Sequence, residues 1–144
     1  MDKVIVALIT GALIAVFSSW VANFFSERRD RKNEFKRARQ EFMDSFLDEI
    51  VKFERSKPFE IKGTVVYDVL IKAYHKHYAA MHRYRSQLQL NGQDITDLDD
   101  LWEQYQYPDK NKNQGIFGIY LSSSSFSADF VLQRINLLVN YKNP

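Results

Sequence analysis

The sequence has 144 residues, a net charge of +2 and no cysteine. The absence of cysteine excludes a disulfide framework, a cysteine-ligated zinc site and a thiol nucleophile. A net charge so close to zero gives no argument for a nucleic-acid partner. The chain contains 11 Phe and 8 Tyr, so it has enough large apolar side chains for one folded domain, and its length after the apolar N-terminal stretch is too short for two.

The first predicted element is a transmembrane helix over residues 4–25, and residues 1–25 are assigned to this anchor. These 22 residues include no ionisable side chain, and at about 1.5 Å of rise per residue they match the roughly 30 Å hydrocarbon core of a bilayer. Trp20, Phe24 and Phe25 lie near one end, where interfacial aromatic residues are expected. A cleaved signal peptide would need small residues at the cleavage site, where Trp20 would stand. A buried core helix, the other alternative, is rarely uncharged for so long.

Basic residues after this segment predict its orientation. Seven bases stand between residues 28 and 39, whereas only Lys3 precedes the segment. Because bases that flank a membrane helix are retained in the cytosol, we expect a protein of the inner (cytoplasmic) membrane with its N-terminus outside and its C-terminal domain in the cytosol. Five of the bases are also predicted to contact anionic lipid, unless orientation alone explains them: Arg28, Arg29, Arg31, Lys32 and Lys36.

Small side chains recur at every fourth position of the predicted membrane helix. They are Ala7, Gly11, Ala15 and Ser19. Such a row lets two helices approach closely, which suggests a homo-oligomer or pairing with another membrane protein. The alternative is that small residues, which are common in membrane helices, fall into this register by chance.

Residues 26–34 are predicted to form a charged juxtamembrane stalk, and residues 35–144 a helical cytosolic domain. No Pro or Gly interrupts residues 26–55, so one helix is expected there, ending before Pro58. The apolar residues of this helix recur at steps of three or four and predict a buried stripe. They are Phe35, Ala38, Phe42, Phe46, Ile50 and Phe53.

The second predicted domain helix runs over residues 65–88, with Thr64 as its N-cap. Its wide apolar face indicates a central helix of the bundle. The predicted stripe is Val66, Leu70, Ala73, His77, Met81, Tyr84 and Leu88. The bases on the same helix are predicted to lie on a solvated face: Lys72, Lys76, Arg83 and Arg85.

Three further elements complete the prediction. A short helix is expected over residues 97–106, with Thr96 opening a capping box and Tyr107–Pro108 ending the helix. Residues 116–121 are predicted to form one helical turn or a strand. A last helix is expected over residues 127–141. No segment alternates with period two, so the predicted class is all-α: a transmembrane helix and charged stalk leading into a small bundle of three long helices and one short one.

The sequence predicts no catalytic, cofactor-binding or metal site, and the protein is expected not to be an enzyme. His75 and His77 point to different sides of their helix, and His77 is expected to be a hydrogen-bonded core residue. A run of acids without a base opens the short helix, where acids favour the helix dipole, and these are Asp94, Asp97, Asp99, Asp100 and Glu103. Neither a phosphate-binding glycine loop nor a nucleophile elbow is present.

The layout resembles a loose group of small bacterial and phage proteins with one N-terminal membrane helix. The resemblance rests on the charged stalk with its Phe stripe, the helix of residues 67–88, the Leu101-Trp102-Glu103-Gln104-Tyr105 segment and the Ile/Leu-rich last helix. It implies a bacterial or phage origin and carries over no catalytic residue.

Two functional hypotheses follow. The first is a membrane-tethered, non-enzymatic interaction module whose domain binds an unknown protein at the cytosolic face, without nucleic acid. It predicts an exposed apolar or aromatic patch on the domain. The second is a phage-type membrane effector, active in lysis or superinfection exclusion, that acts by oligomerisation of its transmembrane helix.

Overall fold

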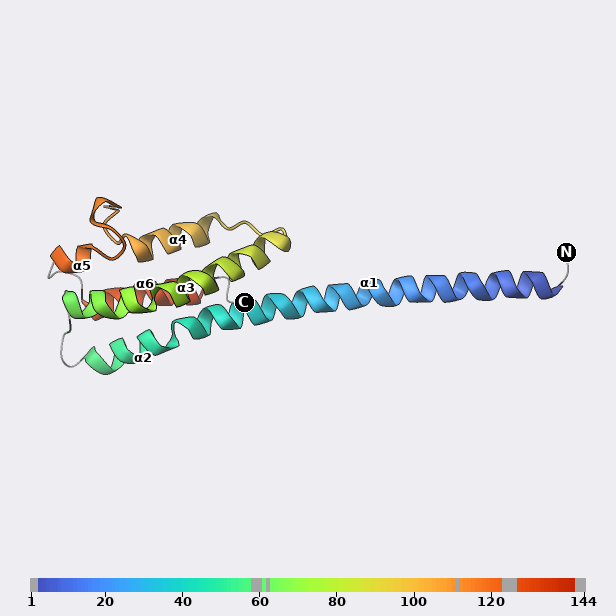
Figure 1. The fold of residues 1–144 in the computed structure, drawn as a ribbon, viewed down its shortest axis with the longest axis horizontal. Coiled ribbons are helices and arrows are strands. Elements are labelled where there is room, and N and C mark those ends of the chain that lie inside the picture. The colour runs from blue at the N-terminus through green and yellow to red at the C-terminus, as the bar shows by residue number, and fades with distance from the viewer. Residues whose placement is uncertain (1–2, 58–60, 62, 111, 123–126, 142–144) are drawn as a thin grey trace. The chain divides into compact units, whose positions relative to one another are not determined.

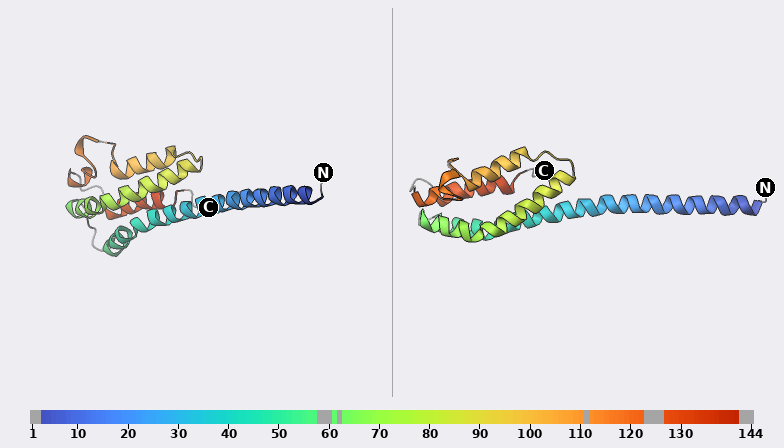
Figure 2. Two further views of the ribbon diagram at one scale, coloured as in Figure 1. Left: turned by 45° about the vertical axis from the view of Figure 1, so that its right-hand side comes forward. Right: turned by 45° about the horizontal axis from the view of Figure 1, so that its top comes forward.

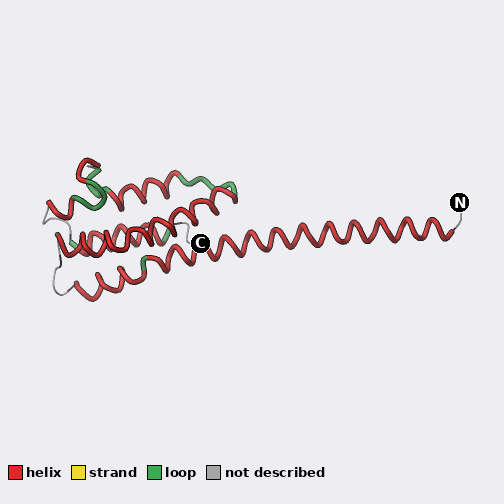
Figure 3. The backbone as a smooth tube through the Cα atoms, in the orientation of Figure 1, coloured by secondary structure: helices red, strands yellow, loops and turns green. Residues whose placement is uncertain are grey.

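The computed structural model describes the backbone of residues 3–57, 61, 63–110, 112–122 and 127–141, and the side chains of these residues except 3–13 and 122. Its helices are α1 (Lys3–Ser45), α2 (Leu47–Ser56), α3 (Thr64–Leu90), α4 (Thr96–Gln106), α5 (Ile119–Ser122) and α6 (Ala128–Val139), with the 3₁₀ turn η2 at Lys112–Gln114 (Figure 1). Figure 3 shows only helices and loops in the part of the chain that it describes. The prediction of an all-α helical bundle is therefore confirmed.

The chain divides into two compact units, Met1–Lys36 and Arg37–Pro144. The first unit consists of α1 residues. Among the side chains that the structure describes, which begin at Ile14 in this unit, no helix has the length and apolar character needed to cross a membrane. Residues 4–13 of the predicted membrane segment lie outside the described side chains, so this finding does not cover the whole segment.

The predicted helix over residues 26–55 is wrong in one respect, because it is broken at Phe46. Here α1 ends at Ser45 and α2 begins at Leu47. The Ser45 hydroxyl donates to the Phe42 carbonyl at 2.7 Å, and the Phe46 amide donates to the Met43 carbonyl at 3.2 Å. The Phe46 amide bond spans three residues instead of four and tightens the end of α1, and the Ser45 side chain bonds to the same turn.

The Phe stripe of this broken helix fills the bundle core. Phe42, Phe46 and Phe53 are at most 1% exposed, as predicted, but Phe35 and Ile50 are only half-buried. Glu49 takes the core position expected for Ile50 and is 3% exposed. The stripe therefore contains a carboxylate that the apolar pattern did not predict.

The predicted stripe of α3 is confirmed at all seven positions, since these are the buried residues of the helix. The predicted N-cap is wrong by one residue. Gly63 precedes the helix with φ 57° and ψ −126°, and its carbonyl accepts the Tyr67 amide at 3.0 Å. A positive φ of this kind favours glycine, so Gly63 rather than Thr64 turns the chain into α3.

The remaining helices pack around this core. Residues 116–121 were predicted to form one helical turn or a strand, and the helical alternative is correct from residue 119, where α5 begins. The predicted capping box is wrong: the Asp94 carboxylate accepts the Thr96 amide at 2.9 Å and the Thr96 hydroxyl at 2.8 Å. Helix α6 packs against both α2 and α4, and α3 packs against α2 and α5. Figure 2 shows this bundle from two further sides.

Candidate functional site

Most described apolar residues of the first unit are open to solvent, Val21 and Phe35 being half-buried. Ile14, Phe17, Trp20 and Phe25 are 61–65% exposed. Phe17, Trp20 and Phe24 follow one another along α1, with ring centroids 6.3 Å and 5.9 Å apart. The Arg28 guanidinium lies 4.3 Å from the Phe24 ring centroid, so a cation–π contact marks the boundary between the apolar and the basic residues.

The residues predicted to contact lipid and to pack membrane helices lie on this same helix. All five predicted lipid-contact bases are exposed, namely Arg28, Arg29, Arg31, Lys32 and Lys36. Ala15 and Ser19 are also exposed, whereas the side chains of Ala7 and Gly11 lie outside the described residues. No ligand geometry follows from these positions, and both assignments stay predictions.

A buried polar network joins three helices of the bundle. His77 of α3 is fully buried and stacks on Phe46 with ring centroids 4.1 Å apart. Its Nε2 lies 3.0 Å from Glu49 Oε2 on α2, and its Nδ1 lies 2.8 Å from the Tyr105 hydroxyl on α4. The prediction that His77 is a hydrogen-bonded core residue is confirmed.

The electrostatics of this network favour an ionised Glu49. Burial raises the pKa of Glu49, but hydrogen bonds and charge interactions with His77 and Lys76 outweigh it, so the net pKa is below its ordinary value. Burial first, and then the nearby Glu49 charge, hold the pKa of Tyr105 well above its ordinary value. An ionised carboxylate only accepts and a protonated phenol can donate. With a proton on Nε2, His77 donates to Glu49, and the Tyr105 hydroxyl can donate to Nδ1.

The acidic run at the start of α4 does not converge. Asp94 accepts from Thr96, Asp99 pairs with Arg85 at 2.8 Å, and Glu103 pairs with Lys112 at 2.8 Å. Within the described residues, no group of three or more His, Asp or Glu side chains is placed to hold a metal ion. Residues 123–126, which include most of the Ser-rich loop, lie outside the described part of the chain.

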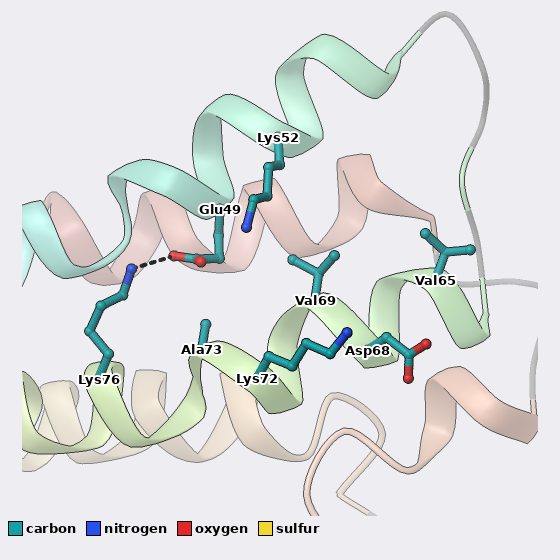
Figure 4. A pocket seen from close by; sticks show the side chains of 8 residues that line it. All are labelled: Glu49, Lys52, Val65, Asp68, Val69, Lys72, Ala73 and Lys76. Carbon is teal, nitrogen blue, oxygen red and sulfur yellow. Dashed lines mark hydrogen bonds and ion pairs between the residues drawn. The ribbon is translucent and has the colours of Figure 1, made fainter.

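A groove of about 510 Å³ lies between α2 and α3 on the bundle. Glu49 and Lys52 line it from α2, and the rest of the lining comes from α3: Val65, Asp68, Val69, Lys72, Ala73 and Lys76. Figure 4 shows the side chains of both helices around this groove. We call these eight residues the α2–α3 groove.

One end of the α2–α3 groove is closed by ion pairs. Lys76 Nζ lies 3.2 Å from both Asp48 Oδ2 and Glu49 Oε2. Burial lowers the pKa of Lys76, but its bonds to Asp48 and Glu49 outweigh this and leave the pKa raised. Glu49 therefore belongs both to the groove wall and to the buried network, and it links the groove to His77.

Sequence reasoning missed the two features that define this site. Glu49 is three residues after Phe46 and four before Phe53, so it shares their face. This register was a signal for its burial, but charged residues usually occupy the solvated face. The bases of α3 were predicted to be solvated, and Lys72, Lys76 and Arg83 are indeed exposed, with Arg85 half-buried. The prediction did not foresee that Lys72 and Lys76 would line a groove beside α2.

Comparisons with protein-family models, with curated proteins and with solved structures found no match to this chain. The resemblance to small bacterial and phage membrane proteins stays a prediction. The candidate site therefore rests on the geometry of this chain.

Proposed function

We propose that this protein is a membrane-tethered interaction module without catalytic activity. Its single membrane helix is residues 4–25, and its helical domain, residues 35–144, binds a protein partner on the cytosolic side of the inner membrane. The observation that carries the proposal is an uncharged stretch of 22 residues followed by seven bases between residues 28 and 39. This order of apolar and basic residues is typical of an anchor whose following domain stays in the cytosol.

The exposure of the aromatic residues on α1 supports a membrane environment. Phe17, Trp20 and Phe25 are 63–65% exposed, so the described residues of the first unit leave most of their surface uncovered. Burial of apolar surface contributes about 25 cal/mol per Å², and the hydrocarbon core of a bilayer supplies that burial.

The bundle is better suited to binding than to catalysis. The groups that resemble a catalytic relay, Glu49, His77 and Tyr105, are at most 3% exposed. His77 and Tyr105 do not line the α2–α3 groove, and only Glu49 of the three reaches its wall. We infer that their hydrogen bonds serve to hold α2, α3 and α4 together. The α2–α3 groove, in contrast, opens to solvent.

Two measurements on the intact chain test the location. After cell fractionation and alkaline extraction, we expect the protein in the membrane pellet. A reporter active only in the cytosol, fused after Pro144, is expected to give a signal, and a reporter active only outside is expected to give none. Recovery in the soluble fraction would contradict the anchor, and a signal from the outside reporter would contradict the orientation.

The second candidate is an effector that acts by oligomerisation of the membrane helix. It rests on the row of small residues in the sequence, of which Ala15 and Ser19 are exposed, as are their neighbours on α1. Replacing Gly11 and Ala15 by Leu blocks close helix approach. We expect the double variant to stay in the membrane and to keep partner binding if the bundle is the active part. If the membrane helix is the active part, the same variant is expected to lose both oligomers and function.

A further inference from the structure

The α3 side of the α2–α3 groove has two parallel rows with different chemistry. Val65, Val69 and Ala73 form an apolar row, and Asp68, Lys72 and Lys76 form a charged row beside it. Each row repeats every four residues, so both follow one face of the helix. The groove thus offers an apolar floor with charged side chains along its edge.

The floor is long and shallow. From Val65 to Lys76, α3 extends about 16 Å, or about three helical turns. Val65 is 52% exposed, so the groove does not enclose what binds there. A small ligand usually needs a pocket that covers most of its surface, whereas a helix of about three turns can lie along a floor of this length.

Two lysines of the groove have no acidic partner in the described part of the chain. Lys76 is already paired with Asp48 and Glu49. Lys52 and Lys72 form no ion pair with any described carboxylate, although Asp68 lies one turn before Lys72. Figure 4 shows Lys52 reaching from α2 toward α3, and Lys72 lying along α3. The lining therefore holds three lysines against two acids, Glu49 and Asp68, a net charge of +1. Lys52 and Lys72 stand beside the apolar floor without an ion pair among the described residues.

We propose that the α2–α3 groove binds an acidic amphipathic helix of a protein partner. Apolar side chains of that helix cover Val65 and Val69, and its carboxylates pair with Lys52 and Lys72. An anionic lipid headgroup would satisfy the lysines but would leave the floor uncovered, so a helix fits the groove better. The inference rests on the proposed function, because it names the class of partner that the interaction module takes.

The test uses the full chain in nanodiscs of phosphatidylcholine. The probe is a fluorescently labelled peptide of about 15 residues, long enough for a helix, with Leu at positions i, i+3, i+4 and i+7 and Glu beside them. A matched peptide carries Lys in place of Glu. By fluorescence anisotropy we expect the acidic peptide to bind at least about tenfold more tightly than the basic one, with an affinity that falls as salt is added.

The variant Lys52→Glu/Lys72→Glu is expected to bind the acidic peptide at least about tenfold more weakly. Its matched control is Arg55→Glu/Lys110→Glu, which reverses two exposed bases outside the groove and should bind as the unaltered protein does. Circular dichroism verifies that both variants are folded. A third variant, Val65→Ser/Val69→Ser, is expected to weaken binding several-fold if the floor is covered.

Three results would overturn the inference. The first is that the acidic and basic peptides bind equally well. The second is that the groove variant and its control weaken binding equally. The third is that short-chain phosphatidylglycerol displaces the acidic peptide more strongly than sodium chloride at the same ionic strength. The last result would assign the groove to lipid headgroups. None of these results affects the location of the protein, which fractionation and the reporters decide separately.

Discussion

The two units of this chain use similar side chains in opposite ways. In the first unit, Phe17, Trp20 and Phe25 are 63–65% exposed. In the second unit, Phe42, Phe46 and Phe53 are at most 1% exposed. Both sets of aromatic rings offer a large apolar surface. Their exposed fractions differ because the rings of the second unit pack against other helices, whereas those of the first unit have no such packing surface among the described residues. The bundle supplies its own partner surface, and the first unit depends on its surroundings for one.

The largest expected effect comes from placing charges among the exposed apolar residues of the first unit. In the proposed membrane location, Ile14→Arg/Phe17→Arg adds about 2.5–3.5 kcal/mol of insertion cost for each arginine. We expect this variant to move from the membrane pellet to the soluble or degraded fraction after alkaline extraction.

The matched control places the same charges on exposed apolar residues of the bundle. Leu47 and Val51 are 55% and 39% exposed on α2, so Leu47→Arg/Val51→Arg is expected to remain in the pellet. If the Ile14→Arg/Phe17→Arg variant also stays in the pellet, residues 14 and 17 do not lie in the hydrocarbon core of the membrane, and the anchor proposal fails.

The next largest effect concerns the bundle core. The Phe46 ring lies 4.1 Å from the ring centroid of His77 and 5.3 Å from that of Phe42. Phe46→Ala leaves a cavity among these rings and is expected to lower the free energy of unfolding by about 3–5 kcal/mol. Urea denaturation followed by circular dichroism measures this loss. Phe17→Ala is the control, and a loss of similar size in both variants would show that Phe17 also has a partner in the chain.

The helices of the bundle show how much of the structure could be predicted from the sequence. The stripe of α3 was predicted at every position because a 3.6-residue period places Val66, Leu70 and His77 on one face whatever surrounds them. The end of α4 before Pro108 was predicted for an equally local reason, since the residue before proline avoids the helical region.

The break at Phe46, the burial of Glu49 and the α2–α3 groove depend on contacts that the spacing of apolar residues does not reveal. The break at Phe46 arises from hydrogen bonds that Ser45 and Phe46 make to the preceding turn, and Ser45 by itself is common within helices. Glu49 is buried because His77 and Lys76 reach it from another helix. The α2–α3 groove likewise requires the relative placement of two helices, which no single stretch of sequence reveals.

A smaller effect is expected from the charge that the bundle buries. Because the pKa of Glu49 lies below its ordinary value of 4.5, the folded state favours the ionised carboxylate. This stabilisation is present above about pH 4.5 and is lost as the pH falls through the pKa of the folded state. Glu49→Gln is expected to cost about 1–3 kcal/mol at pH 7, because His77 and Lys76 lose a charged acceptor.

The dependence of the unfolding free energy on pH distinguishes the contribution of the buried Glu49 carboxylate from that of exposed carboxylates. Between about pH 5 and pH 3 the unfolding free energy of Glu49→Gln is expected to fall less than that of the unaltered protein. Glu54→Gln is the control, since the Glu54 side chain is 48% exposed in its pair with Lys57. If Glu49→Gln and the unaltered protein lose equal stability on acidification, the buried carboxylate does not contribute to the acid response.

The smallest expected effect is at the ion pair between Arg83 and Glu41. Its nitrogen and oxygen are 2.6 Å apart, closer than the 3.0 Å between His77 and Glu49. The distance is nevertheless a poor guide to the contribution, because the Arg83 and Glu41 side chains are 53% and 37% exposed. Water screens such pairs, so Arg83→Ala is expected to change the free energy of unfolding by at most about 1 kcal/mol. A loss in urea denaturation as large as that of Glu49→Gln would show that exposure does not decide what these charges contribute.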